Sequence, residues 1–322
     1  MTKKSVMTVA LFGLGKAGFS NGLDRLRKNP ASHFHSIKKC PQMELVAVID
    51  TYVNGLDLLT KEGYTGKFFR SLEEFLTSSD EVDLIVIATP SSTHKYIATE
   101  IIRKKNPICI FCEKPGGQTL EELEEIVDLA KKRNIHLGIN YFRRWDSTFA
   151  SIVSDVQKNL KTLKKIVCFY NNGLENYAVH IIDLLIWITP DWKLEYTDGC
   201  KNNPTFILVN SHGLQAEILG FPASLKYDLF SVHLFFPDQV IQLDSGGRRY
   251  QLLETKDDLY YTGYSSLQHT KESLVTLSGF EPIYEEISNC LNSSNFSSFY
   301  SINDALSNLT LIDQIKNCEF NP

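Results

Sequence analysis

The sequence predicts an α/β fold in which a doubly wound parallel sheet is followed by a second, α+β domain. In residues 1–140, apolar strand-like runs alternate with helical patterns, which is how βαβ units build a parallel sheet. These runs are nearly continuous in branched apolar residues, as expected where helices cover both faces of a sheet. After residue 141, consecutive strand-like runs are separated by short turns, and this favours a large, mostly antiparallel sheet.

The first part contains six predicted strands and the helices that link them. Two helices begin with a capping box, Ser71 with Glu74 and Thr119 with Glu122, in which each side chain satisfies a backbone N–H group of the first turn. The predicted strands are 5–13, 44–50, 67–71, 82–89, 107–113 and 135–140. One predicted helix follows the glycines at 13–18. Three more are predicted at 71–78, about 92–105 and 119–134.

The second part has a different organisation. The run "AVHIIDLLIWI" at 178–188 is apolar on nearly every side and predicts a buried helix. The other predicted helices are 142–160, 281–291 and 301–317, and the predicted strands are 164–171, 205–210, 216–221, 224–236, 239–245 and 248–255. We therefore predict a first domain at 1–140 and a second at 141–322, with the last helix able to pack back on the first domain. A substrate cleft is expected between them.

Composition and charge exclude several classes of partner. The formal net charge of -5 and the pI of about 5.9 leave no basic field for a nucleic acid. No run reaches the length of a membrane span. The apolar stretch near the N-terminus is short and ends in glycines rather than in a signal-peptide cleavage site. Seven scattered cysteines fit a reducing compartment, so we expect a cytoplasmic protein without a nucleic-acid or membrane partner.

Two motifs that could suggest metal or redox chemistry have a structural interpretation. Cys109 and Cys112 lie three positions apart in a predicted strand, so their side chains face opposite sides of the sheet. His33 and His35 have no acidic or sulfur neighbour in the sequence and are expected on the surface or in packing contacts. We predict no metal site.

Unusual residues gather where the predicted strands end. They are Gly13, Asp50, Thr89, Pro90, Glu113, Lys114, Pro115 and Asn140. In a doubly wound sheet the ligand binds beyond the carboxyl ends of the strands. The sequence therefore predicts a ligand site at this edge.

The stretch "GLGKAG" at 13–18 is a Gly-x-Gly-x-x-Gly motif that follows a strand and is expected to open a helix. Gly13 allows a tight turn, and Gly18 allows the helix to pack closely on the strand. Gly15 lets backbone N–H groups approach a pyrophosphate, with Lys16 and Ala17 in the same loop. The motif predicts a dinucleotide site.

Asp50 indicates which dinucleotide. A carboxylate at the end of the second strand accepts hydrogen bonds from the adenosine ribose hydroxyls and repels a 2′-phosphate. Thr51 and Tyr52 follow it, and neither is an arginine that would bind that phosphate. The sequence therefore predicts NAD in preference to NADP.

The chain also resembles the Gfo/Idh/MocA family, the glucose-fructose oxidoreductase, inositol dehydrogenase and rhizopine catabolism proteins. The resemblance rests on "ATPSSTHKYIA", "CEKPGGQTLEE", "INYFRRWDSTF" and "GLENYAVHIIDLLIWI", and Glu-Lys-Pro is the most specific of these motifs. It implies an N-terminal Rossmann domain and a second domain whose sheet makes the contact of a homodimer or homotetramer. It further implies hydride transfer between a nicotinamide and a carbon of a sugar or cyclitol.

The resemblance assigns roles to single residues. Lys114 would be the cation beside a developing alkoxide, with a cis bond to Pro115. His180 would be the general acid or base, and Asp183, one turn along the same helix, could orient its imidazole. The positions that match the nicotinamide half of the cofactor site are Thr89, Pro90, His94, Glu113 and Asn140, and those that match a substrate border are Arg144 and Trp145.

One position departs from the family pattern. Many members carry aspartate four residues before the histidine, whereas this chain has Asn176, with Glu175 beside it. An amide binds a substrate hydroxyl but takes no proton. Either His180 works alone with Lys114, or Glu175 replaces the missing carboxylate, or redox activity is altered.

The leading hypothesis is an NAD-dependent dehydrogenase or reductase that acts on a small sugar, cyclitol or nucleotide-linked sugar. One alternative is a non-redox enzyme, glycosidase-like, in which bound NAD is recycled within each turnover. The other is a regulatory protein that senses a nucleotide without catalysis. Lys114 and His180 favour an enzyme, and Asn176 keeps the regulatory alternative open.

Overall fold

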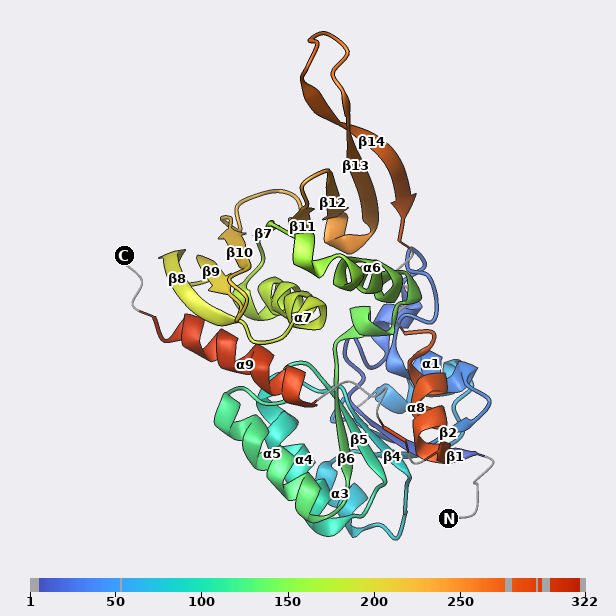
Figure 1. Cartoon of the computed structure of the whole chain (residues 1–322). Coiled ribbons are helices and arrows are strands. Elements are labelled where there is room, and N and C mark those ends of the chain that lie inside the picture. Colours follow the sequence, from blue (N-terminus) through green and yellow to red (C-terminus); the bar gives the residue numbers. More distant parts are fainter. Residues whose placement is uncertain (1–5, 53, 276–279, 294, 297–301, 319–322) are drawn as a thin grey trace. The chain divides into compact units, whose positions relative to one another are not determined.

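The computed structural model describes residues 6–52, 54–275, 280–293, 295–296 and 302–318. The chain divides into two compact units, whose elements are drawn in Figure 1. The first unit is Met1–Asp146 with Ser278–Leu306, and the second is Ser147–Leu277 with Ser307–Pro322. The domain boundary expected after residue 140 stays a prediction. None of the described helices has the length and apolar character needed to cross a membrane.

The first unit is built on a parallel sheet, which confirms the predicted doubly wound fold. Its six strands follow the order β3-β2-β1-β4-β5-β6, and every neighbouring pair is parallel. Chain order runs outward in both directions from β1, as in a Rossmann sheet. The strands are β1 Met7–Phe12, β2 Met43–Ile49, β3 Lys67–Phe69, β4 Leu84–Ile87, β5 Cys109–Glu113 and β6 His136–Asn140.

Helices cover both faces of this sheet. Val9 and Leu11 of β1 share one buried cluster with Phe34 of α1 and Ile283 of α8, and Figure 1 shows α3, α4 and α5 on the opposite side. The helices of this unit are α1 His33–Lys39, α2 Gly55–Lys61, α3 Leu72–Thr77, α4 His94–Lys104, α5 Leu120–Lys132 and α8 Ile283–Ser293. The sequence-based division assigns α8 to the second domain, whereas α8 packs here on the first sheet.

Both predicted capping boxes are confirmed. The Ser71 hydroxyl accepts a hydrogen bond from the Glu74 N–H at 3.1 Å, and the Glu74 carboxylate accepts from the backbone of Arg70 at 2.7 Å. At α5, the Thr119 hydroxyl accepts from the Glu122 N–H at 3.3 Å. These bonds fix where α3 and α5 begin.

The prediction that the glycine motif opens a helix is wrong. One helical turn begins within the motif, closed by a bond from the Phe19 N–H to the Gly15 carbonyl at 2.9 Å. A short 3-10 helix, Ser20–Leu23, comes next, and α1 begins only at His33. The connection contains Gly22 and Pro30, which are the two poorest helix formers, and this explains the interruption.

The second unit contains an eight-stranded sheet in the order β14-β13-β12-β11-β7-β10-β9-β8. All neighbouring pairs are antiparallel except β7 with β10, so the predicted mostly antiparallel sheet is confirmed. The strands are β7 Lys165–Tyr170, β8 Lys193–Cys200, β9 Asn203–Val209, β10 Gln215–Gly220, β11 Phe230–Phe235, β12 Gln239–Asp244, β13 Arg249–Asp257 and β14 Ser265–Leu274.

Three helices complete this unit. They are α6 Ser147–Lys158, α7 Val179–Ile188 and α9 Ile302–Lys316, whose first residues belong to the first unit. As predicted, α7 is buried on nearly every side, and only His180 and Trp187 are half-buried. A π-helical segment, Leu174–Ala178, leads directly into α7.

Candidate active site

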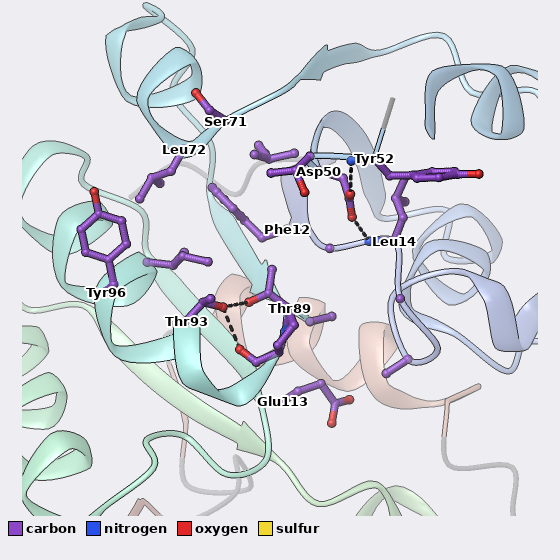
Figure 2. A pocket seen from close by; sticks show the side chains of 18 of the residues that line it. Phe12, Leu14, Asp50, Tyr52, Ser71, Leu72, Thr89, Thr93, Tyr96 and Glu113 are labelled. Carbon is purple, nitrogen blue, oxygen red and sulfur yellow. Dashed lines mark hydrogen bonds between the residues drawn. The ribbon is translucent and has the colours of Figure 1, made fainter. Parts of the chain in front are cut away.

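The first unit contains a cavity of about 900 Å³ at the carboxyl ends of its strands, drawn in Figure 2. Its wall comes from the ends of β1, β2, β4 and β5, from the turn after β3, and from the start of α4. A doubly wound sheet binds its ligand at this edge. The predicted site residues that line the cavity are Gly13, Gly15, Lys16, Ala17, Asp50, Thr89, Pro90, Glu113 and Lys114.

The three motif glycines have different surroundings. Gly13 has a φ of +98°, and a Cβ there would lie 2.6 Å from the Ala88 carbonyl oxygen. A Cβ on Gly18 would lie 2.0 Å from the Gly13 carbonyl oxygen. A Cβ on Gly15 would meet nothing within 4 Å. The fold therefore requires Gly13 and Gly18, whereas Gly15 borders open space in the cavity.

The Asp50 carboxylate ties the end of β2 to the glycine turn. One of its oxygens, Oδ2, accepts a hydrogen bond from the Leu14 N–H at 2.5 Å, and Oδ1 accepts from the Tyr52 N–H at 2.7 Å (Figure 2). A carboxylate oxygen has a second lone pair, so both oxygens can also accept from a ligand hydroxyl. Asp50 therefore stands where the sequence predicts a contact with a ribose.

Arg70 also lines the cavity, and the sequence-based argument on Asp50 did not include it. Arg70 directly follows β3, and β3 pairs with β2, so the ends of the two strands lie side by side. The signal was available in the predicted strand 67–71, because the residue after a neighbouring strand reaches the same edge of the sheet. A cation beside Asp50 weakens the argument against a 2′-phosphate.

The turn after β4 is held by its own side chains and by His94. The Thr93 hydroxyl donates to the Pro90 carbonyl oxygen at 2.7 Å, and it lies 2.8 Å from the Thr89 hydroxyl (Figure 2). His94 lies behind the cavity wall, 1% exposed, with Nε2 2.8 Å from the Thr89 carbonyl oxygen and Nδ1 2.7 Å from the Pro115 carbonyl oxygen. His94 thus links the end of β4 to the turn that carries Lys114.

A second set of buried side chains holds Glu113. Its Oε1 accepts hydrogen bonds from His33 Nε2 at 2.9 Å and from Asn140 Nδ2 at 2.7 Å. The Asn140 Oδ1 in turn accepts from Trp145 Nε1 at 3.1 Å. Asn140 is buried and does not line the cavity, so it acts on the cavity through Glu113. His33 has the predicted packing role, but its bond to Glu113 was not foreseen.

Burial raises the pKa of Glu113. This effect is outweighed by the hydrogen bond and electrostatic interaction with His33, the bond from Asn140 and the charge of Lys114, so the pKa lies below its ordinary value. Glu113 is therefore ionised at neutral pH although its side chain is only 16% exposed. A carboxylate kept charged at the wall of a cavity is typical of functional sites.

Lys114 lies between two anchored neighbours. Glu113 is held through its carboxylate and Pro115 through its carbonyl oxygen. The Lys114–Pro115 peptide bond is cis, as the resemblance implies. The backbone on both sides of Lys114 is thus fixed where the lysine lines the cavity.

Arg144 and Trp145, the two predicted substrate residues of the first unit, lie in a short 3-10 helix, Phe142–Trp145, after β6. Arg144 forms an ion pair with Asp304 at 2.8 Å. The Trp145 ring contacts Phe111 edge to face, with ring centroids 5.8 Å apart. These contacts tie the segment to β5 and α9, while its role toward a substrate stays a prediction.

The remaining predicted catalytic residues belong to the second unit. Glu175 and Asn176 lie exposed in the π-helical segment, and Glu175 forms an ion pair with Lys316. His180 is half-buried in the first turn of α7, and Asp183 is buried one turn further on. The carbonyl of Val179, next to His180, accepts a bond from the buried Asn308 side chain at 2.9 Å. π-helical turns are frequent at functional sites.

No metal centre emerges from the part of the chain that the structure describes: it holds no group of three or more His, Cys, Asp or Glu side chains suited to a metal ion. Cys109 and Cys112 are buried thiols outside any disulfide, and burial raises the pKa of both.

The sheet topology, the glycine turn and the carboxylate at the end of β2 together define a dinucleotide-binding domain.

Comparison with known proteins shows what the N-terminal domain is similar to. Residues 7–141 match the family model described as "Oxidoreductase family, NAD-binding Rossmann fold", that of the Gfo/Idh/MocA proteins. The rhizopine catabolism protein MocA of Rhizobium meliloti is 27% identical over 172 residues, 49% of this chain and 53% of that protein. Inositol 2-dehydrogenase 2 of Paenarthrobacter aurescens is 27% identical over 130 residues, 35% of this chain and 39% of that protein. The match with each of these two relatives thus spans about half of the relative's length or less.

Solved structures share the fold over the whole chain. The WlbA dehydrogenase from Bordetella pertussis, in complex with NADH and UDP-GlcNAcA, has a TM-score of 0.76 at 16% identity and covers 98% of this chain and 97% of its own. A 3-ketoreductase from Actinomadura kijaniata, in complex with TDP-benzene and NADP, has a TM-score of 0.75 at 11% identity and covers 98% and 100%. The predicted resemblance is confirmed: residues 7–141 match the NAD-binding Rossmann domain of the Gfo/Idh/MocA oxidoreductase family.

Proposed function

We propose that this chain transfers a hydride between a nicotinamide cofactor and a hydroxyl- or carbonyl-bearing carbon of a sugar, cyclitol or nucleotide-linked sugar. One observation carries the proposal: a single cavity brings together the glycine turn, Asp50 and Lys114. Relatives named as inositol dehydrogenases, and a structural neighbour in complex with NADH and a sugar nucleotide, support it.

The residues present fit a nicotinamide dinucleotide. Gly15 borders space that a side chain would fill, so backbone N–H groups of the turn can approach a pyrophosphate. The Asp50 carboxylate is fixed by two backbone N–H groups and has lone pairs for ribose hydroxyls. The cavity of about 900 Å³ is in the size range of cofactor sites. When bound, the nicotinamide accepts or donates the hydride.

The chain supplies charge and proton transfer around that chemistry. We assign Lys114 to stabilise negative charge on the reacting oxygen, because an oriented cation acts most strongly where charge develops. Glu113, Thr89 and Pro90 would border the nicotinamide half, supported by their place in the cavity wall. Lys16 and Ala17 would contribute to the pyrophosphate contact.

We assign His180 as general acid or base, because histidine is the residue type best suited to exchange a proton near neutral pH. Asp183 would orient the imidazole, and Asn176 would bind a substrate hydroxyl through its amide. Glu175 is the one carboxylate next to Asn176, but it already forms an ion pair with Lys316. This ion pair favours His180 rather than Glu175 as the group that moves the proton.

We further propose NAD as the cofactor, on the strength of Asp50, and a cytoplasmic homodimer or homotetramer assembled through the eight-stranded sheet. Arg70 is the residue that could reverse the cofactor preference, because its guanidinium would bind a 2′-phosphate. A direct comparison of the affinities for NADH and NADPH tests this.

The experiment combines binding and turnover. NADH and NADPH are titrated by fluorescence, and sugars, inositols and sugar nucleotides are then screened at the absorbance band of reduced nicotinamide. Lys114→Ala should abolish turnover, whereas Lys132→Ala, an exposed lysine at the end of α5, serves as the matched control. Activity that survives Lys114→Ala would contradict the assigned role. Turnover without net NADH formation would point to recycled NAD, and cofactor binding without turnover to a sensor.

A further inference from the structure

A chain of buried hydrogen bonds runs from helix α8 to the cavity wall. The Tyr284 hydroxyl lies 2.7 Å from His33 Nδ1, and His33 Nε2 lies 2.9 Å from Glu113 Oε1. Tyr284 and His33 are both 0% exposed. The contacts join α8, α1 and the end of β5. Tyr284 is 251 positions from His33 in the sequence, and Glu113 is 80 positions from His33.

The chemistry of the groups fixes the direction of the bond to Glu113. The carboxylate only accepts, so His33 Nε2 carries the hydrogen. The direction of the second bond follows the protonation of His33: Nδ1 accepts from the Tyr284 hydroxyl in the neutral imidazole and donates to its oxygen in the imidazolium. Both described bonds to the carboxylate, from His33 and Asn140, end at Oε1. Among the described residues, no hydrogen bond reaches Glu113 Oε2.

Packing alone does not explain this chain. His33 contacts the rings of Phe111 and Phe280 edge to face, with ring centroids 6.0 and 5.1 Å apart. In such apolar surroundings, buried polar groups cost free energy unless every bond is made. An apolar residue at position 33 would avoid that cost. What His33 adds is a directed donor to a carboxylate that adjoins Lys114.

We propose that His33 and Tyr284 are positioning residues, which hold the ionised Glu113 in one orientation and thereby fix the turn that presents Lys114 to the cofactor cavity. The proposal rests on the proposed function. Neither residue lines the cavity, so their effect passes through Glu113. Tyr284 brings α8, a segment far along the chain, into the support of the active site.

The titration of Glu113 distinguishes positioning from simple packing. The titratable groups that act on Glu113 are His33 and Lys114, and those that act on Tyr284 are Glu113 and Cys40. The bond from His33 lowers the pKa of Glu113, so its removal raises that pKa. Protonation of Glu113 then begins at higher pH. The acid limb of cofactor binding, the range in which affinity is lost as the pH falls, therefore moves to higher pH.

The test measures NADH and NADPH affinity against pH for the full chain, with no substrate required. His33→Leu should weaken binding about tenfold or more at neutral pH, the size of one bond to a charged group, and shift the acid limb upward. His33→Gln, which keeps a donor for Glu113, should restore most of the affinity. Tyr284→Phe should give a smaller shift in the same direction. His35→Gln, on the same helix and without contact to Glu113, is the matched control.

The outcomes separate the two proposals. If the wild-type chain binds neither dinucleotide, the proposed function is wrong and the positioning role fails with it. If the wild type binds and both His33→Leu and Tyr284→Phe keep its affinity and its acid limb, only the positioning role is overturned. Should His33→Leu fail to fold, Tyr284→Phe and His33→Gln still decide, because an unchanged acid limb in Tyr284→Phe contradicts the proposal.

Discussion

Two substitutions in the glycine turn, Gly15→Ala and Gly18→Ala, should have opposite effects on stability and binding. A methyl group at Gly15 meets nothing within 4 Å, whereas one at Gly18 lies 2.0 Å from the Gly13 carbonyl oxygen. Both changes add the same atom within a four-residue stretch. The pair therefore distinguishes a glycine required by the fold from one required by a ligand.

The expected magnitudes follow from these contacts. At Gly15, alanine reduces the entropy of the unfolded chain and should stabilise by about 0.4–1 kcal/mol. At Gly18, the turn and β1 must separate to admit the methyl group, and such overpacking costs about 1–3 kcal/mol or more. For a unit of this size, 1 kcal/mol shifts Tm by about 2–4 °C. Gly18→Ala should therefore lower Tm by roughly 2–12 °C, while Gly15→Ala leaves it unchanged or slightly higher.

For NADH binding, Gly15→Ala is the variant expected to lose affinity. The Gly15 methyl group occupies the space through which a pyrophosphate reaches the backbone N–H groups. A lost hydrogen bond to a charged group is worth about 1.5–3 kcal/mol, which corresponds to roughly a ten- to hundredfold rise in Kd. Thermal denaturation and NADH titration on the same samples measure both quantities. Unchanged NADH affinity in Gly15→Ala would refute the assignment of the turn to a pyrophosphate, and an unchanged Tm in Gly18→Ala would refute the packing argument.

Three further changes have defined outcomes. His94→Leu removes both contacts to backbone carbonyl groups and should lower stability by about 1–3 kcal/mol for each buried group left without a partner, as measured by urea unfolding. Arg70→Ala should weaken NADPH binding more than NADH binding, and equal losses for the two dinucleotides would show that Arg70 does not meet a 2′-phosphate. Thr119→Ala removes the cap of α5 and should cost about 0.5–2 kcal/mol in thermal denaturation, with NADH affinity unchanged because Thr119 does not line the cavity.

The fold could be predicted wherever a buried strand or helix has a recognisable pattern of apolar residues. The strands of the first sheet have helices on both faces, so they are continuously apolar and were recognised. In the second sheet, β8 and β14 were missed, and these are its two edge strands. Most of their residues are exposed, so neither strand has the apolar alternation that arises from one buried face. The parallel pairing of β7 with β10 likewise has no local signal.

The candidate site could be predicted as a location but not as a set of contacts. The rule that ligands bind at the carboxyl ends of parallel strands gathered Gly13, Asp50, Thr89 and Lys114 at one edge, and the structure places them around one cavity. The same rule does not predict that His94 lies behind the wall of the cavity rather than in it. A strand end specifies an edge of the sheet, whereas the direction of a side chain depends on neighbours that lie far away in the sequence.

The support of Lys114 shows why those contacts lie beyond the reach of one sequence. Its neighbour Glu113 is held by His33 from 80 positions upstream and by Asn140 from 27 positions downstream. His33 in turn meets Tyr284 across 251 positions. His33 and Tyr284 each lie in an otherwise ordinary apolar or loop segment, so their own surroundings favour a packing role. Only once the sheet and helices bring these segments together does a polar residue in an apolar core require a partner, and here the partners lead to the wall of the cavity. Buried polar residues that a sequence reading assigns to packing are therefore the first places to look for the supports of an active site.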